Sequence, residues 1–341
     1  MRLHLGYIPL LDAAPLIAAA EFGFAAEEGL DLDLSAEPSW ATLRDRLALG
    51  YLDGAHMLAP LALASALGLS GPPADLVVPL GLNLNGNAIT LSADLWRAMA
   101  PGDDAPATVA RAFAGLAEAR KRAGRPLTLG TVHPFSCHTY QLRHFLALGG
   151  LDLSSVRLVA VPPQHSVEAL ARGIVDGFCA GAPWNGVAVA AGIGRIAALA
   201  CEIVPDAPEK VLALSARLGE GALPLVRAVA RAGLWCAEPG NRAELAHRLA
   251  ARSALGQDAG LIARCLEGEI VLDAAGRRRR APGYIRLGRP ALEPGEAQLR
   301  WLVSEMEQGG QIPVGAGAAG AFEAARRIYR PDLLAAAGLD A

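Results

Sequence analysis

Four short segments carry hydrogen-bond donors of the kind that bind anions, and each lies near the end of an expected strand. They are residues 38–40, 83–87, 133–138 and 208–210. A small planar anion such as nitrate has three acceptor oxygens and no donor, so its site needs N–H groups and a positive charge and should exclude carboxylates. The four segments therefore predict a site for a small planar anion.

Each segment contributes one candidate contact. Trp40 offers an indole N–H at the start of an expected helix, where backbone N–H groups also face an anion. Asn87 offers an amide, His138 an imidazole N–H and Lys210 a compact charge. Ordinary alternatives stay open: Trp40 as a core aromatic and Asn87 as a turn residue. His138 also fits a helix surface, and Lys210 a solvated side chain.

Lys210 is distinctive because this chain uses arginine for almost all of its cations. Only Lys121 and Lys210 are lysines among 31 basic residues. A lysine in such a chain favours a point charge at this position over a bidentate guanidinium. The sequence therefore points to Lys210 as the cation of the site.

Other chemistry finds little support in the sequence. His133, Cys137 and His138 resemble a metal cluster, but a fourth ligand is not identifiable, so no metal is expected. The chain has no GxxxxGK[S/T], GxSxG or HExxH motif and no convincing catalytic set. We therefore expect neither a cofactor nor an enzyme.

Alternating strand and helix patterns predict an α/β fold. The first 90 residues switch repeatedly between the two patterns, with helices expected over residues 14–28, 40–49 and 59–67 and a turn over residues 83–86. A second such series begins near Ala93, with helices expected over residues 106–121 and 137–148. Repeated βα units imply parallel sheets covered on both faces, and two lobes joined by more than one crossover form a ligand cleft. Residues 268–294 read as a surface insertion, in which Arg277 to Arg280 are either solvated or a partner-binding patch.

Composition excludes several other classes of protein. The 341 residues are 52% hydrophobic and 19% charged with a net charge of −3, which lacks the basic footprint of direct nucleic-acid binding. Five cysteines without CxxC spacing argue against a disulfide framework. The N-terminal residues show no secretory leader and no segment predicts a membrane-spanning helix, so we expect a cytoplasmic protein.

Several ordered motifs carry a family resemblance that is clear over residues 1–215. They are residues 5–10 with 12–15, 20–23, 39–45, 81–90 and 176–185. Together they resemble the nitrate-binding and bicarbonate-binding proteins of ABC transporters and their cytosolic relatives, the NasS-type nitrate/nitrite sensors. The resemblance implies a type II periplasmic-binding-protein fold, with residues 1–90 and 205–341 in lobe 1, residues 91–204 in lobe 2, and a ligand cleft between the lobes.

The resemblance also implies that Trp40, Asn87, His138 and Lys210 stand at the anion contacts of the family. Transport members tend to have Gln at the position of Asn87, and many have Glu at the position of Ala182. Bicarbonate has one O–H donor that nitrate lacks, so its site gains from an acceptor carboxylate. A cation at Lys210 favours nitrate or nitrite instead.

Among these relatives, the absence of a leader favours the cytosolic sensor. The resemblance then implies that the ligand-free protein holds an ANTAR-type antiterminator (NasT-like) inactive, and that nitrate or nitrite releases it to act on the leader RNA of nitrate-assimilation operons. The alternative is the substrate-binding component of a nitrate ABC transporter. An enzyme of the thiamin-pyrimidine synthase group, which the family resembles in outline, would need a Cys-rich motif that this sequence does not have.

Overall fold

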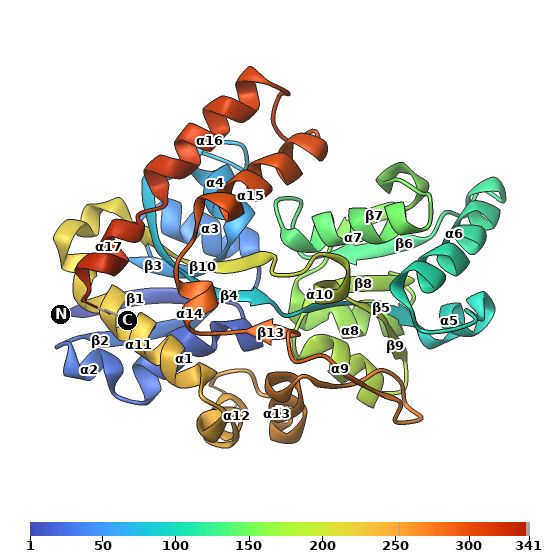
Figure 1. Ribbon diagram of the computed structural model, residues 1–341, viewed down its shortest axis with the longest axis horizontal. Helices are drawn as coiled ribbons and strands as arrows, with labels where there is room; N and C mark the ends of the chain where they lie inside the picture. Colours follow the sequence, from blue (N-terminus) through green and yellow to red (C-terminus); the bar gives the residue numbers. More distant parts are fainter. Residues whose placement is uncertain (252, 339–341) are drawn as a thin grey trace.

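Two mixed β-sheets lie side by side in the computed structural model, which describes residues 1–251 and 253–338 (Figure 1). The six-stranded sheet has the order β13-β4-β10-β3-β1-β2 and the five-stranded sheet the order β7-β6-β8-β5-β9. We call each sheet with its helices a lobe. The strands are β1 Arg2–Tyr7, β2 Asp31–Ala36, β3 Gly54–Leu58, β4 Leu76–Asn85, β5 Asn87–Ser92, β6 Thr128–Thr131, β7 Arg157–Ala160, β8 Gly177–Gly181, β9 Gly194–Leu199, β10 Pro208–Ser215, β11 Glu269–Val271, β12 Arg278–Arg280 and β13 Ile285–Arg286.

The expectation of parallel sheets is only partly correct. Strands β1, β2 and β3 pair in parallel, as do β6, β7 and β8. However, β10 is antiparallel to β3 and β4, and β5 is antiparallel to β8 and β9. The chain enters β5 and β10 from the other lobe and not through a βαβ crossover within the same sheet. The rule that such crossovers join parallel strands therefore does not constrain these two strands, and they pair antiparallel to their neighbours.

The chain passes between the lobes at Gly86. β4 continues to Asn85 and β5 begins at Asn87, so the turn expected over residues 83–86 is almost wholly strand. Gly86 has a φ of 102°, a conformation that favours glycine. The polar side chains of residues 83–87 are therefore held by two regular strands, and not by a mobile loop.

Helices cover both sheets, and serine side chains cap two that matter for the site. Ser39 Oγ accepts from the Thr42 N–H at the start of α3, and Ser136 Oγ accepts from the Thr139 N–H at the start of α7. The helices are α1 Ala14–Glu21, α2 Phe24–Glu27, α3 Trp40–Ala48, α4 Ala59–Ala66, α5 Ala93–Met99, α6 Pro106–Arg122, α7 Cys137–Leu148, α8 Ser166–Ala171, α9 Trp184–Ala190, α10 Ala200–Ile203, α11 Leu223–Ala237, α12 Arg242–Leu249, α13 Ala259–Glu267, α14 Arg289–Leu292, α15 Glu296–Gln308, α16 Ala316–Ile328 and α17 Pro331–Ala336.

Short 3₁₀ segments complete the connections, at Leu11–Ala13, Leu153–Ser155, Pro163–His165, Ala216–Ala222 and Pro239–Asn241. One helix expected over residues 14–28 is divided into α1 and α2, because Gly23 between them has a φ of 86°. Within the described ranges, none of the helices is both long and apolar enough to cross a membrane.

The hairpin β11–β12 and its arginines are bound to the five-stranded lobe. Arg279 pairs with Glu202 at 2.7 Å and Arg277 with Asp104 at 2.7 Å. The Ile196 N–H of β9 also donates to the Leu272 carbonyl at 2.9 Å. The arginine run is therefore not simply solvated: two of its members tie this part of the C-terminal half to the second sheet.

Candidate functional site

A buried ion cluster centred on Lys210 lies where the two lobes meet. Lys210 Nζ is 2.8 Å from Asp12 Oδ2 and 3.0 Å from Glu209 Oε2, and all three side chains are at most 1% exposed. Burial alone would lower the pKa of Lys210, but the two carboxylates outweigh it and raise that pKa. Lys210 is therefore charged at neutral pH.

Asp12 connects this cluster to His56 on β3. Its Oδ1 lies 2.8 Å from His56 Nε2, while the Ile8 N–H donates to His56 Nδ1 at 3.4 Å. Burial lowers the pKa of His56 despite the Asp12 carboxylate, so the ring is neutral. Burial acts in the opposite direction on Asp12, but Lys210 and His56 hold the pKa of Asp12 well below its usual range.

Glu209 holds the amide of Asn87 in one orientation. Asn87 Nδ2 donates to Glu209 Oε1 at 2.6 Å and to Gln141 Oε1 at 2.8 Å, and Gln141 Nε2 donates to Glu209 Oε1 at 2.7 Å. Burial raises the pKa of Glu209, although Lys210 and Asn87 favour its ionised form. Both N–H groups of the Asn87 amide are therefore occupied, and its oxygen, Oδ1, is the group that can accept a hydrogen bond from a ligand.

Four buried polar atoms around this cluster have no hydrogen-bond partner among residues 1–251 and 253–338. They are Trp40 Nε1, Asn87 Oδ1, and both Nδ1 and Nε2 of His138, and we call them the open atoms. Buried polar groups are nearly always hydrogen-bonded, so several in one place indicate a ligand site. Trp40 also lies beside the cluster, with Lys210 Nζ 6.0 Å and the His56 ring 5.4 Å from its ring centroid.

Gly181 leaves space beside two of the acceptor atoms. A Cβ at this position would lie 3.4 Å from both Asn87 Oδ1 and Asp12 Oδ2. The backbone here also joins the lobes, since the Ala182 N–H donates to the Gly86 carbonyl and the Ala182 carbonyl accepts from the Leu11 N–H. A side chain at residue 181 would therefore occupy part of the region that the open atoms face.

The fold brings the predicted residues Trp40, Asn87, His138 and Lys210 to one place, with all four side chains at most 1% exposed. Two details differ from the sequence-based expectation. Carboxylates are present beside the cation rather than excluded, because a fully buried lysine needs counter-charges. Asn87 presents an acceptor oxygen instead of N–H groups, because Glu209 and Gln141 take both donors.

Sequence reasoning missed four members of the cluster: Asp12, His56, Gln141 and Glu209. One signal was available, because Glu209 and Lys210 are adjacent charges at the start of the apolar strand β10. Charges inside such a strand are buried and must be paired. The partners Asp12 and Gln141 carry no comparable signal, since only tertiary packing brings them to β10, Asp12 from within the six-stranded lobe and Gln141 from the other lobe.

His133 belongs to the same predicted segment as His138, residues 133–138, but makes only a local contact. Its Nδ1 accepts from the Phe135 N–H at 3.1 Å. Burial and the Arg44 guanidinium lower the pKa of His133 to about 4. His133 therefore acts within its own loop, whereas His138 is the histidine with open atoms.

We also searched the described residues for metal-binding groups and reactive thiols. Residues 1–251 and 253–338 hold no group of three His, Cys, Asp or Glu side chains arranged for a metal ion. The thiols near the cluster are Cys137 and Cys179, and burial raises the pKa of each well above its usual value. Both thiols are therefore protonated and unsuited to nucleophilic attack.

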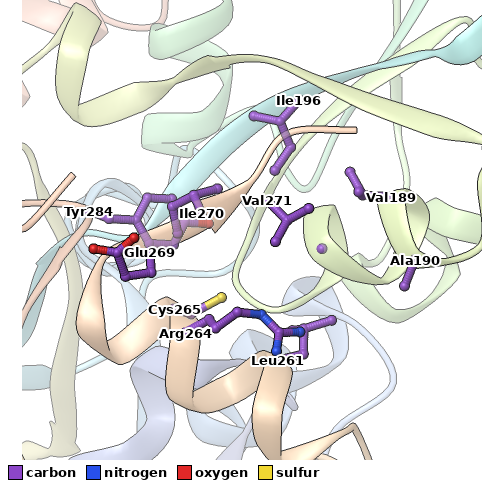
Figure 2. Close-up of a pocket in the computed structure, with 11 residues that line it drawn as sticks. Val189, Ala190, Ile196, Leu261, Arg264, Cys265, Glu269, Ile270, Val271 and Tyr284 are labelled. Atoms are coloured by element: carbon purple, nitrogen blue, oxygen red, sulfur yellow. The ribbon is translucent and has the colours of Figure 1, made fainter. Parts of the chain in front are cut away.

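A separate apolar hollow lies between α9 and β9 on one side and α13 and β11 on the other (Figure 2). Leu261, Ile270 and Val189 line it, with Arg264 and Glu269 as its charged side chains. The hollow encloses about 470 Å³, partly open to solvent, and includes none of the four predicted contacts. Its walls suit apolar groups rather than a small inorganic anion.

The chain is similar to a family of known proteins and to two anion-binding proteins. A model of the NMT1-like family matches residues 1–250. The nitrate/nitrite binding protein NrtA of Synechococcus elongatus is 34% identical over 254 residues, which are 71% of this chain and 56% of that protein. The bicarbonate-binding protein CmpA of the same organism is 30% identical over 291 residues, 81% of this chain and 62% of that protein.

Among solved structures, the periplasmic nitrate-binding protein NrtA from Synechocystis PCC 6803 matches with a TM-score of 0.89 at 26% identity, covering 99% of this chain and 88% of that chain. The expected two-lobe, periplasmic-binding-protein-like α/β fold is thus confirmed. The chain spans about half the length of several sequence relatives.

Proposed function

The chain belongs to the NMT1-like family, and from this premise we propose that it binds a small planar oxyanion, nitrate or nitrite, between its two lobes. One observation carries the proposal: the open atoms of Trp40, Asn87 and His138 gather around the buried cation Lys210. The names of the relatives support it, since nitrate, nitrite and bicarbonate are all small planar oxyanions.

The donors of the site match the acceptors of nitrate in number. Among the described residues, Asp12 and Glu209 accept hydrogen bonds from two of the three N–H groups of the Lys210 ammonium. The third N–H group is therefore available to a ligand. The Trp40 indole and one His138 ring nitrogen supply two more N–H donors. Three donors around one charge suit the three oxygens of nitrate.

Hydrogencarbonate is the second candidate ligand, because one open atom is an acceptor. Asn87 Oδ1 can receive a hydrogen bond, and nitrate has no hydrogen to give, whereas hydrogencarbonate has one O–H. The preference for nitrate or nitrite that Lys210 predicts from the sequence does not follow from charge alone, since each of these anions carries one negative charge. The choice therefore has to be measured.

Titration calorimetry with nitrate, nitrite, hydrogencarbonate and sulfate at constant ionic strength tests this function. We expect saturable binding of nitrate or nitrite, loss of that binding in Lys210→Met, and none of that loss in the control Lys121→Met. Lys121 lies in the last turn of α6, and its Nζ donates to the Ser154 carbonyl at 3.1 Å. Binding of hydrogencarbonate alone would select the second candidate, and binding of none of these anions would refute the proposal.

For the role of the bound anion, we propose a cytoplasmic sensor that holds an ANTAR-domain antiterminator (NasT-like) and releases it on binding nitrate or nitrite. The family resemblance supports this role, as does Ala182 at a position where many transport members have Glu. The anion can release the partner only if it binds the free protein more tightly than the complex, so partner and anion must oppose each other.

A substrate-binding component of a nitrate ABC transporter is the alternative role, and the similarity to the nitrate/nitrite binding protein NrtA supports it. Size-exclusion chromatography with the purified antiterminator separates the two roles. The sensor predicts a complex that forms without nitrate and dissociates when nitrate is added. Failure to form a complex under either condition would leave the transport role, and nitrate binding itself would stand.

A further inference from the structure

Glu209 joins the buried cation of the site to the amide of Asn87. Its Oε2 accepts from Lys210 Nζ at 3.0 Å. Its Oε1 accepts from Asn87 Nδ2 at 2.6 Å and from Gln141 Nε2 at 2.7 Å, and Asn87 Nδ2 also donates to Gln141 Oε1 at 2.8 Å. We call the three bonds among Asn87, Gln141 and Glu209 the amide triangle. All of these side chains are fully buried, so water does not compete for their polar groups.

The direction of the bonds in the amide triangle follows from the chemistry of Glu209. A carboxylate oxygen carries no hydrogen and only accepts, so each neighbouring amide turns its nitrogen toward Oε1. Two N–H groups occupy both lone pairs of Oε1, so this atom is an acceptor whichever charge the carboxyl group carries. Because Asn87 directs its nitrogen to Glu209, its oxygen points away from the triangle.

Asn87 Oδ1 lies at a space that Gly181 leaves open. Asn87 of β5 and Gly181 of β8 are paired across the sheet. A Cβ at Gly181 would lie 3.4 Å from Asn87 Oδ1 and equally close to Asp12 Oδ2, so two acceptor oxygens border this space. Asn87 Oδ1 has no partner among the described residues, and an unpaired buried acceptor is unfavourable. The site therefore gains stability from a ligand that brings a hydrogen to this space.

We propose that Glu209 is a specificity-determining positioning residue, which holds the Asn87 amide with its oxygen toward the ligand and so favours an oxyanion that carries an O–H group. The inference rests on the proposed function, because it concerns the same anion site. Hydrogencarbonate can donate its O–H to Asn87 Oδ1, whereas nitrate and nitrite have no hydrogen to give. Glu209 thus sets the relative affinity for the two kinds of anion.

Glu209→Gln should reverse the direction of every bond in the amide triangle. The Lys210 ammonium only donates, so it attracts the oxygen of the introduced amide, and the nitrogen of that amide then faces Asn87 and Gln141. Each of these two side chains can exchange the places of its oxygen and nitrogen by rotation, so that both oxygens accept from the introduced nitrogen. Gln141 Nε2 then donates to Asn87 Oδ1.

This reversal retains all three bonds of the amide triangle and changes what the ligand meets. The Asn87 amide would direct N–H groups to the ligand instead of an oxygen, and N–H groups match the acceptor oxygens of nitrate. The cation also keeps a counter-charge, since Asp12 Oδ2 lies 2.8 Å from Lys210 Nζ. We therefore expect Glu209→Gln to fold and to bind anions.

The experiment measures the Kd for nitrate and for hydrogencarbonate by calorimetry at pH 8, in the wild-type protein and in Glu209→Gln. The quantity to compare is the ratio of the two Kd values, because both ligands are monovalent anions and loss of the Glu209 charge acts on them alike. We expect the ratio of the nitrate Kd to the hydrogencarbonate Kd to fall about 10- to 100-fold in the variant, which corresponds to pairing one buried polar group.

Gln141→Met is the matched control. It removes one partner of the Asn87 amide at similar side-chain volume but leaves the Glu209 carboxylate as an acceptor, so Asn87 should keep its orientation. Any effect on packing acts on both anions, and the Kd ratio should stay at its wild-type value. A shift of the ratio as large as in Glu209→Gln would show that loosening of the amide triangle, and not its direction, controls selectivity.

Neutron diffraction from crystals of the wild-type protein tests the orientation without a variant. The deuterium atoms of the Asn87 amide should lie on the atom that faces Glu209 and Gln141, and the atom beside Gly181 should carry none. A nitrogen beside Gly181, or an unchanged Kd ratio in folded Glu209→Gln, would overturn this inference and leave the proposed function intact. Absence of saturable binding of nitrate, nitrite and hydrogencarbonate would overturn both.

Discussion

Lys210 Nζ lies 2.8 Å from Asp12 Oδ2, and this fully buried ion pair joins β10 to the 3₁₀ turn that follows β1. Neither charge is accessible to water, so each depends on the other and on Glu209 and His56 around them. The cation of the proposed anion site is therefore also a structural element of the six-stranded lobe.

Replacing Lys210 with Met should abolish nitrate binding and destabilise the fold. The substitution leaves Asp12 and Glu209 as buried carboxylates without a cation, and breaking such a cluster costs about 3–5 kcal/mol. Urea unfolding should record this loss, and calorimetry at a temperature where the variant is folded should detect no nitrate binding.

A second substitution separates the two effects of that change. In Lys210→Met with Glu209→Gln, one buried negative charge is removed, so part of the lost stability should return while binding does not. Recovery of nitrate affinity in the double variant would show that Lys210 supports the fold without contacting the anion.

Trp40→Phe should weaken nitrate binding while keeping the aromatic packing of the site. Phe retains a ring near Lys210 and His56 but removes the indole N–H, an open atom of the site. A hydrogen bond to a charged group contributes about 1.5–3 kcal/mol, so affinity should fall about 10- to 100-fold. Unchanged affinity by calorimetry would place the Trp40 N–H outside the anion site.

Arg195→Met should loosen the attachment of the β11–β12 hairpin to the five-stranded lobe. Arg195 pairs with Asp273 at 2.7 Å and with Asp104, and its guanidinium carbon lies 4.0 Å from the Trp96 ring centroid. We expect a loss of about 2–3 kcal/mol in urea unfolding, since two partly buried carboxylates lose a shared cation.

The control for this change is Arg280→Met. The Arg280 side chain is 81% exposed and lies 3.5 Å from Glu269, so its removal should alter stability by less than about 0.5 kcal/mol. Equal effects of the two substitutions would contradict the role of Arg195 in holding the hairpin.

Stability should decrease as the pH falls below about 6.5. Burial lowers the pKa values of His56, His138 and His133 in the folded state, and that of His133 to about 4. The unfolded chain therefore takes up protons that the folded protein does not bind. Each such histidine lowers the free energy of unfolding by up to about 1.4 kcal/mol per pH unit. This stability is fully present above the pKa of an unfolded histidine and is lost on the acid side.

The measurement is the urea midpoint between pH 8 and pH 4, with His133→Gln as the comparison. Removing one of the three histidines should reduce the slope by up to about 1.4 kcal/mol per pH unit. An identical slope in the variant would show that His133 titrates equally in the folded and unfolded states.

Much of the secondary structure follows from local patterns in the sequence. The residue range expected for α7 is the one observed, and α3, α4 and α6 differ by one residue at one end. These helices carry signals in their own residues, such as the Ser136 cap and Pro106 at the start of α6. The direction of β5 and β10 lacks such a signal, because it depends on where the chain crosses between lobes.

Trp40, Asn87, His138 and Lys210 stand out in the sequence as candidate contacts, by their chemistry and by resemblance to a family. Their environment depends on the tertiary structure. Asp12, Gln141 and Glu209 reach the cluster from separate elements, and they set the charge beside Lys210 and the orientation of Asn87. The reason is physical: a buried charge must find its counter-charges nearby in space, and sequence spacing does not record which distant side chains folding brings there.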